Sequence, residues 1–226
     1  MVQERAVVWC LMLLISGVVW GADSYTCRFT AGQWQAADWT RVKSPRWDRL
    51  GEWVQEPDGI RNQTPPGATP AELLGKSSPE TYSSMVVARP FEGNLTVRAS
   101  FTFDDQMAPL IVLAPELGKD AKDQPEYREH FEVVAYDKGI NVWHHTWADG
   151  KLAWKKAAYW NFELKPKVRY ALEVQVNHSS RGPMLVVKLD DREMGYLDTS
   201  LPTKCYVGIT GCEGVNHFYD FSVRSE

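Results

Sequence analysis

Residues 130–147 read HFEVVAYDKGINVWHHTW, two runs of alternating side chains on either side of Asp137-Lys138-Gly139. A polar tripeptide that ends in glycine is typical of a β-hairpin whose turn closes with a left-handed residue, because glycine adopts a positive φ without a steric penalty. The stretch therefore predicts an antiparallel hairpin with a three-residue loop. We expect the remaining strands of the chain to pack around this hairpin.

The length of the loop determines which residues pair across the hairpin. A three-residue loop pairs Tyr136 with Ile140, Val134 with Val142, Glu132 with His144, and His130 with Thr146. Paired residues share a face of the sheet. The opposite face carries Phe131, Val133 and Ala135, which are successive apolar positions. This opposite face, which also carries Trp143, is therefore predicted to point to the core. His130, Glu132, Tyr136 and His144 are then predicted to lie on the outer face, and a slip of one residue would exchange the faces.

Further alternating runs predict more strands. Apolar and polar residues alternate over 94–103 and again over 168–177, the period of a strand with one buried face. Residues 183–189 and 194–197 predict a second hairpin, 205–210 and 217–223 predict the closing strands, and short strands at 52–55 and 59–62 and a helical turn at 71–74 complete the pattern. Closely spaced strands without helical periods between them indicate an all-β, antiparallel two-sheet sandwich, with a barrel as the alternative.

The N-terminal segment is of a different kind. Residues 6–19 read AVVWCLMLLISGVV behind Arg5, and the small residues Gly21 and Ala22 follow. This pattern predicts a secretory signal peptide over 1–22. A transmembrane anchor is the alternative, and it is less favoured because the apolar run is shorter than the ~20 residues that a membrane span needs. Residues 23–226 are then expected to form one domain, secreted or periplasmic.

Charge and hydropathy limit the partners. The formal net charge is -4, and it is unchanged by removal of the leader because Glu4 and Arg5 leave together. Nucleic-acid-binding domains usually show a basic patch or stripe, so no nucleic acid partner is expected. No later stretch is apolar enough to span a membrane, and the mature chain is expected to be a monomer.

Cysteines carry a prediction of their own. Cys27, Cys205 and Cys212 remain once Cys10 has left with the leader, and an odd number in a secreted chain leaves one thiol over. Because the first and last strands of a β-sandwich are often neighbours, Cys27 is expected near the final strands, in a disulfide with Cys205 or Cys212. Three unpaired buried thiols are the alternative.

The order of motifs along the chain carries a resemblance. The motifs are Asp58-Gly59-Ile60, residues 91–97 (FEGNLTV), the hairpin at 130–147, residues 170–174 (YALEV), Val207-Gly208-Ile209 and residues 218–223 (FYDFSV). This order resembles the concanavalin A-like lectin/glucanase superfamily, and within it the secreted bacterial jelly-roll domains grouped with laminin-G-like and 3-keto-disaccharide hydrolase-like proteins. The resemblance implies a jelly-roll sandwich over 23–226 whose concave outer face often holds glycans; members are lectins, hydrolases, lyases or spacers.

Glucanases of this superfamily carry Glu-x-Asp-x-x-Glu on one strand. The corresponding run here, residues 130–136, has a single acid, Glu132. A retaining glycosidase needs two carboxylates about 5 Å apart, and an inverting one needs a wider pair, but the sequence identifies no second carboxylate. Glu132 with His130, His144 and Tyr136 remains a candidate catalytic set for proton transfer. A solvent-facing ion pair between strands is the alternative.

Aromatic residues provide a second candidate site. Trp147, Trp154, Tyr159 and Trp160 follow the hairpin closely, beside Lys151, Lys155 and Lys156. Flat aromatic rings stack on the apolar faces of sugars, and neighbouring polar groups hydrogen-bond the hydroxyls. These four residues are therefore candidates for glycan binding, and filling of the core and edges of the sandwich is the alternative.

Metal and cofactor signals are weak. His144 and His145 are adjacent on a strand, so they point to opposite faces and cannot readily share a metal. No loop of the Asp-x-Asp-x-Asp-Gly kind occurs, so no metal site and no cofactor are expected, although backbone carbonyls leave calcium open.

Two classes of function follow from these patterns. A secreted glycan-binding or accessory module is favoured, because binding needs only a shaped groove with stacking rings and a few polar groups, with a carbohydrate or polysaccharide as the partner. A polysaccharide- or disaccharide-acting hydrolase or lyase centred on Glu132 is the alternative. It is less favoured because catalysis needs a second group placed against the first, and the sequence identifies no such group. Whether the chain is an enzyme is left open, and so is a purely structural spacer.

Overall fold

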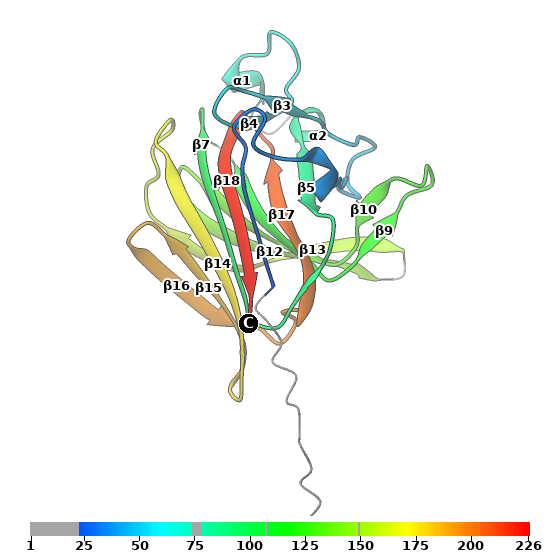
Figure 1. Cartoon of the computed structure of the whole chain (residues 1–226), viewed down its shortest axis with the longest axis vertical. Coiled ribbons are helices and arrows are strands. Elements are labelled where there is room, and N and C mark those ends of the chain that lie inside the picture. Colours follow the sequence, from blue (N-terminus) through cyan, green and yellow to red (C-terminus); the bar gives the residue numbers. More distant parts are fainter. Residues whose placement is uncertain (1–22, 74–77, 107, 149) are drawn as a thin grey trace, which may run out of the picture.

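The computed structural model describes residues 23–226 except for 74–77, 107 and 149 (Figure 1). The signal peptide predicted over 1–22 lies outside these described residues. Two large antiparallel sheets pack face to face, which confirms the predicted all-β sandwich. In the described part of the chain, no helix is both long and apolar enough to cross a membrane.

One sheet, sheet A, contains the strands predicted from the alternating runs. Its order is β16 (Arg192–Leu197), β15 (Gly182–Leu189), β14 (Tyr170–Ser179), β7 (Leu95–Phe103), β18 (Asn216–Ser225), β4 (Ile60–Asn62) and β3 (Trp53–Gln55), with β1 (Ser24–Arg28) also paired to β18. The predicted hairpin around Asp190-Asp191 is β15–β16, and Asp190 has a φ of 51° there.

The opposite sheet, sheet B, is built around the central hairpin. Its order is β13 (Lys151–Asn161), β12 (Gly139–Ala148), β11 (His130–Tyr136), β8 (Pro109–Ala114), β17 (Lys204–Gly211), β5 (Ser83–Val87) and β2 (Trp39–Arg41), with β6 (Phe91–Glu92) also paired to β17. Outside the two sheets lie the hairpin β9 (Leu117–Lys119) and β10 (Pro125–Tyr127), a 3-10 turn η1 (Ala36–Asp38) and the short helices α1 (Pro70–Leu73) and α2 (Ser78–Thr81).

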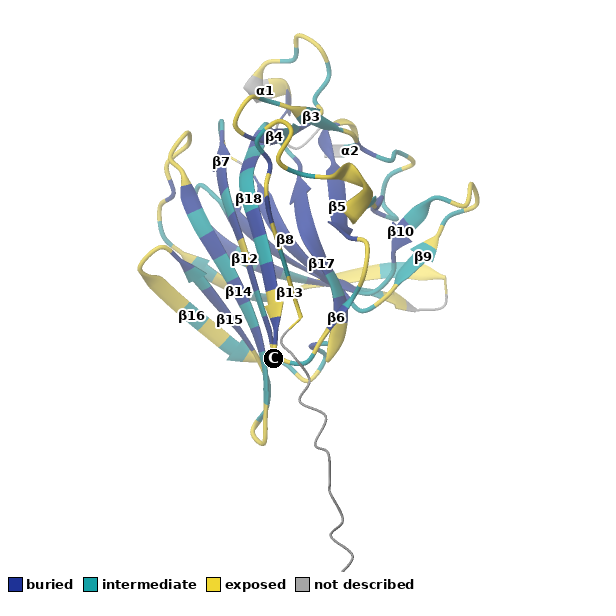
Figure 2. Ribbon diagram, viewed as in Figure 1, coloured by how far each residue is buried: buried dark blue, intermediate teal, exposed yellow. Residues whose placement is uncertain are grey.

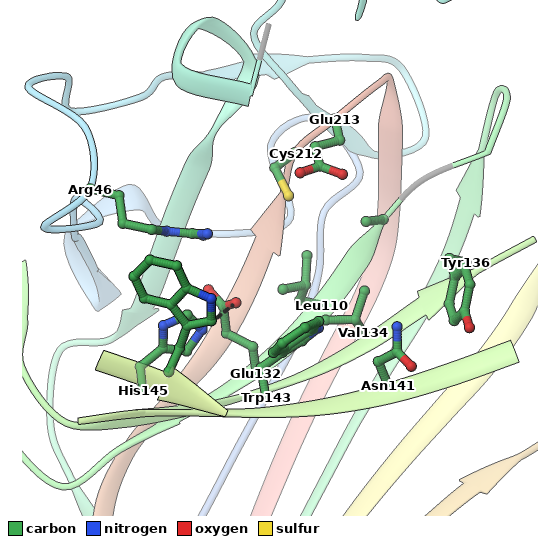
Figure 3. A pocket seen from close by; sticks show the side chains of 12 residues that line it. Arg46, Leu110, Glu132, Val134, Tyr136, Asn141, Trp143, His145, Cys212 and Glu213 are labelled. Carbon is green, nitrogen blue, oxygen red and sulfur yellow. Dashed lines mark hydrogen bonds and ion pairs between the residues drawn. The ribbon is translucent and has the colours of Figure 1, made fainter. Parts of the chain in front are cut away.

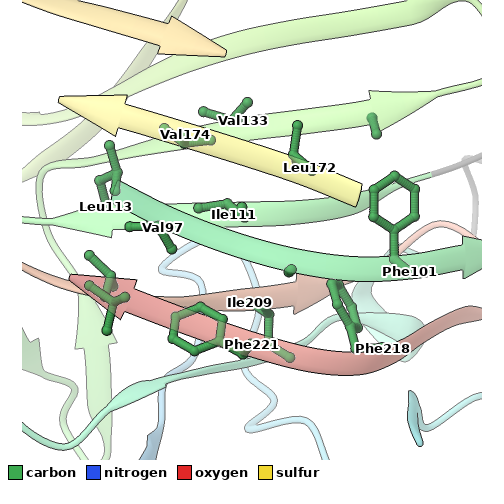
Figure 4. Close-up of a cluster of buried hydrophobic side chains, with 14 of the residues drawn as sticks. Val97, Phe101, Ile111, Leu113, Val133, Leu172, Val174, Ile209, Phe218 and Phe221 are labelled. Atoms are coloured by element: carbon green, nitrogen blue, oxygen red, sulfur yellow. The ribbon is translucent and has the colours of Figure 1, made fainter. Parts of the chain in front are cut away.

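The main hydrophobic core fills the space between the sheets (Figure 4). Val97 and Phe101 of sheet A face Ile111 and Val133 of sheet B, and all four side chains are fully buried. Burial of one such side chain stabilises the fold by roughly 1.5–3 kcal/mol. Figure 2 shows that the central strands are buried, whereas the edge strands β16 and β13 are largely exposed.

Part of the outer face of sheet B is also covered. Val86, Val112 and Ala114 of this face pack against Val42 and Tyr127. The covering segment around Lys43 is held to β10 by backbone hydrogen bonds from Lys43 N to Pro125 O at 2.9 Å and from Tyr127 N to Lys43 O at 3.1 Å. Strand β8 is therefore buried on both faces, and the uncovered part of sheet B is left for a site.

The register of the central hairpin differs by one residue from the prediction. Tyr136 pairs with Gly139, so the loop has two residues, and Glu132 lies opposite Trp143 instead of His144. Gly139 belongs to the strand and has a φ of 130°. A Cβ atom there would lie 1.9 Å from the carbonyl oxygen of Trp160 on β13. The glycine is required by the close approach of β13, and the predicted three-residue loop is wrong.

This slip exchanges the two faces of β12. Ile140 and Val142 point into the core, and His144 stacks on the core residue Phe131 with ring centroids 4.1 Å apart. Trp143 and His145 therefore point outward, against the prediction that Trp143 is buried in the core and His144 exposed. The faces of β11 are as predicted, because Phe131, Val133 and Ala135 lie in the core.

The three cysteines in the described part of the chain are free thiols, and the predicted disulfide from Cys27 to Cys205 or Cys212 is not formed. Cys27 does lie beside the last strand, opposite Phe221, as expected for neighbouring first and last strands. Cys27 and Cys205 belong to the main core, while Cys212 lies in a separate cluster with Tyr82 and Leu110. Burial raises the pKa of the Cys27 and Cys205 thiols to about 12.

Candidate functional site

A pocket of about 180 Å³ opens on the uncovered outer face of sheet B (Figure 3). Figure 3 shows Glu132, Trp143 and His145 on β11 and β12, with Arg46 and Glu213 reaching in from other segments. The full lining consists of Arg46, Ala108, Leu110, Glu132, Val134, Tyr136, Asn141, Trp143, His145, Trp154, Cys212 and Glu213. The pocket therefore combines charged, amide and aromatic side chains from segments far apart in the sequence.

A cluster of two imidazoles and one carboxylate lies beside the pocket, and two of its three members, Glu132 and His145, line the pocket. His145 Nε2 lies 3.1 Å from Glu132 Oε2, and His130 Nε2 lies 3.6 Å from Glu132 Oε1. All three side chains are buried. One ligand atom from each residue lies within 4.8 Å of the other two, a spacing at which the three could hold a metal ion.

The sheet and its cover hold the two imidazole rings in place. His130 lies opposite His145 on the neighbouring strand, and their rings stack with centroids 4.3 Å apart. On its other side the His130 ring stacks on Tyr127 at 4.7 Å. His130 Nδ1 also lies 3.0 Å from the Arg128 carbonyl oxygen. Tyr127 of the β9–β10 hairpin and the following residue, Arg128, thus fix the orientation of the His130 ring.

The charges of the cluster follow from burial and proximity. Burial lowers the pKa of His130, and this effect outweighs the attraction of Glu132 for the charged ring. Burial by itself would raise the pKa of Glu132, but the neighbouring imidazoles hold it well below its ordinary value. At neutral pH Glu132 is therefore a buried carboxylate beside a neutral His130.

Polar and aromatic side chains surround the mouth of the pocket. Trp154 on β13 is 55% exposed, and it lies opposite His145 in the β12–β13 pairing. The ammonium of Lys156 lies 5.2 Å from the centre of the Trp143 ring, a cation–π distance. The mouth therefore presents an exposed indole beside groups that can donate and accept hydrogen bonds.

The predicted catalytic residues are only partly brought together. Glu132 and His130 lie side by side, and Tyr136 lines the same pocket as Glu132. His144 lies on the opposite face of the sheet, where its Nε2 is 2.8 Å from Glu129 Oε1. His145, and not His144, contacts Glu132 on the outer face of the sheet. A hairpin that turns through only Asp137 and Lys138 would have predicted His145 at this position.

The predicted glycan-binding aromatics divide between two faces. Trp154, Trp147 and Tyr159 are exposed, and Trp154 lines the pocket. The Arg128 guanidinium lies 4.7 Å from the centre of the Trp147 ring. Trp160 is half-buried and packs on the core, with its ring 6.4 Å from that of Tyr196. Arg46 and Glu213 were not predicted from the sequence, because nothing local marks them, and Trp143, which lines the pocket, was predicted to lie in the core.

Comparison with known proteins finds similarity only in three dimensions. No protein-family model and no curated protein sequence matches the chain. Arcelin-5, a lectin-like defense protein from Phaseolus vulgaris, has a TM-score of 0.58 at 9% identity over 91% of this chain and 98% of its own. The acidic lectin of winged bean, complexed with methyl-alpha-D-galactose, has a TM-score of 0.52 at 8% identity over 90% of this chain and 98% of its own.

A carbohydrate binding module from Bacillus subtilis, CBM66, is also similar. It has a TM-score of 0.50 at 14% identity over 80% of this chain and 92% of its own. At such identities the likeness shows the fold, and these proteins are concanavalin A-like sandwiches. The chain therefore has the concanavalin A-like jelly-roll fold that its order of strands resembles.

Proposed function

We propose that this protein binds a carbohydrate in the pocket on the outer face of sheet B. The observation that carries the proposal is the convergence of an exposed indole, Trp154, with Glu132, His145, Asn141 and Arg46 on one pocket. A sugar ring offers an apolar C–H face for stacking and hydroxyls that both donate and accept hydrogen bonds. This lining matches both kinds of surface.

The size of the pocket limits what can enter it. Its volume of about 180 Å³ is below the roughly 300–1,000 Å³ of pockets that enclose a drug-sized ligand. One sugar unit of a longer glycan is therefore the proposed occupant, with adjoining units lying over Trp154. Two similar structures, a carbohydrate binding module and a lectin complexed with methyl-alpha-D-galactose, support this choice. A secreted or periplasmic accessory role is part of the proposal.

A glycan array probed with residues 23–226 tests the proposal. Trp154→Ala is expected to weaken binding at least tenfold, because it removes the exposed stacking surface. Leu197→Ala is the matched control, since Leu197 is 61% exposed on β16 of the other sheet, and it should bind as the wild type does. Failure of the wild type to bind any glycan, or an equal loss in both variants, would contradict the proposal.

A second candidate function is favoured by one specific observation. Glu213 lines the same pocket as Glu132, so the structure supplies a second carboxylate that the sequence did not identify. Two carboxylates in one pocket are the usual requirement of a glycoside hydrolase. Arg46 beside them also offers the positive charge that a uronate lyase needs. A polysaccharide- or disaccharide-acting enzyme is therefore the alternative proposal.

A degradation screen on polysaccharides and disaccharides separates the two candidates. An enzyme should turn over a substrate, and Glu132→Gln and Glu213→Gln should each reduce turnover at least 100-fold. Glu129→Gln is the control, because Glu129 pairs with His144 away from the pocket. Glycan binding without turnover would leave the binding module as the function.

A further inference from the structure

The hydrogen bonding of His130 determines which of its nitrogens carries a proton. His130 Nδ1 lies 3.0 Å from the carbonyl oxygen of Arg128. Because a carbonyl oxygen only accepts, Nδ1 must be the N–H donor. In the neutral imidazole Nε2 then carries a lone pair and no proton. That lone pair points toward the carboxylate of Glu132, with Nε2 3.6 Å from Oε1.

Two acceptors therefore face each other inside the protein. His130 Nε2 and Glu132 Oε1 are both buried and have no hydrogen-bond partner. Buried polar atoms in folded proteins nearly always have a partner. The missing partner between these two atoms must be positively charged or a donor, because both present lone pairs.

His145 completes the arrangement from the neighbouring strand. Its Nε2 lies 3.1 Å from the second carboxylate oxygen, Glu132 Oε2, while its Nδ1 is buried without a partner. Imidazole, imidazole and carboxylate thus converge from β11 and β12, and no other group of this kind is found among the described residues. The remaining histidines have other partners: His144 pairs with Glu129, His178 with Pro202 O, and His217 with Glu56.

We infer that His130, Glu132 and His145 bind a divalent transition-metal ion of the zinc class. Two imidazoles and one carboxylate are a ligand set typical of zinc, whereas calcium and magnesium prefer oxygen ligands. Zinc bonds of about 2.0–2.1 Å place tetrahedral ligands about 3.4 Å apart. The present ligand atoms lie within 4.8 Å of one another, so side-chain rotations that close the cluster by on the order of 1 Å suffice.

The site leaves one coordination position to the pocket. Three protein ligands occupy three positions of a tetrahedral zinc ion, and the fourth takes water or a ligand oxygen. Glu132 and His145 both line the pocket, so the open position faces the cavity. A metal there would coordinate an oxygen of whatever enters the pocket. The inference does not depend on a carbohydrate ligand, because the metal site is complete without one.

Zinc titration of the metal-stripped mature chain tests the inference. Isothermal calorimetry with Zn²⁺ alone should give one site per chain with micromolar or tighter affinity, and Ca²⁺ and Mg²⁺ should not compete. His145→Gln should weaken zinc binding at least 100-fold. His144→Gln is the matched control, because His144 is the next residue but lies on the other face of the sheet against Glu129. It should bind zinc as the wild type does.

Two further measurements keep the test independent of folding. Glu132→Gln should also lose zinc while its circular dichroism matches that of the wild type. Substitution with Co²⁺ should give the visible absorption of a tetrahedral site in the wild type and in His144→Gln but not in His145→Gln. An absence of zinc uptake by the wild type would overturn the inference in favour of a protonated His130 paired with Glu132. Equal losses in the two histidine variants would also overturn it.

Discussion

The imidazole rings of His130 and His145 lie on neighbouring strands with their centroids 4.3 Å apart and their planes 3° from parallel. This stacking exists because the hairpin turns through only two residues, which places His145 directly opposite His130. Glu132, one step along the same face of β11, then reaches both rings. The candidate site is thus a product of strand register.

The ion pair between Lys43 and Asp120 predicts a dependence of stability on pH. The hydrogen bond from Lys43, 2.7 Å long, lowers the pKa of Asp120 to about 2 from its ordinary 3.8. The folded state therefore gains stability from the ionised carboxylate at neutral pH, and this stability is lost as the pH falls from about 4 through about 2. Asp120→Asn should lower the melting temperature at pH 7 and reduce its fall between pH 5 and pH 2.

Asp123→Asn is the control for this experiment. Asp123 lies on the same connection and pairs with Lys119, but its side chain is 79% exposed, and exposed ion pairs contribute little. Its melting curve should follow the wild type at each pH. An Asp120→Asn protein with the same profile as the wild type would show that the Lys43 pair does not anchor the covering segment.

Thiol labelling checks the state of the cysteines. At pH 8 a thiol with a pKa of about 12 is ionised in only about one molecule in 10,000. Cys27 and Cys205, being buried as well, should resist alkylation in the native protein. All three thiols of residues 23–226 should label once the chain is unfolded. A peptide map without reduction that contains a Cys27 cross-link would contradict the structure.

Asn62 is expected to be important for the stability of the fold. Its buried side chain donates from Nδ2 to Thr81 O at 2.8 Å and to Gly214 O at 2.9 Å. It also accepts from Asn216 N at 2.8 Å. Loss of three buried hydrogen bonds at about 1 kcal/mol each predicts that Asn62→Ala lowers the free energy of unfolding by roughly 3 kcal/mol. Urea denaturation measures this difference.

The neighbouring residue provides the comparison for Asn62. Gln63 is exposed, and its side chain accepts a hydrogen bond from Arg49 at the surface. Gln63→Ala should change the free energy of unfolding by less than about 0.5 kcal/mol. A similar, small effect of both substitutions would mean that the buried network does not hold β4 to the segments at Thr81 and Gly214.

The predicted signal peptide leads to a prediction about export. Cleavage after Gly21 or Ala22 should release residues 22–226 or 23–226, because small residues follow the apolar run where a signal peptidase cuts. N-terminal sequencing of the exported protein measures the site of cleavage. A membrane-bound product that retains Met1 would contradict the secretory signal.

The sequence alone determined the class of fold and most of the strands. The alternation in residues 95–103 is a local property, and it predicts β7 with one face buried, as the structure shows. The same local signal identifies β14, the β15–β16 hairpin and the closing strands β17 and β18. It also places Glu132 on the outer face of β11. Periodicity is readable from the chain because neighbouring side chains of a strand point to opposite faces.

Only the tertiary structure decided the register of the hairpin and therefore the site. Asp137-Lys138-Gly139 is compatible with a two-residue or a three-residue loop, and the choice depends on the β13 backbone, which leaves no room for a Cβ at Gly139. That contact selects His145 over His144 for the site. Arg46 and Glu213 join the pocket from distant segments. Such contacts arise from long-range packing, which residue spacing along the chain does not encode.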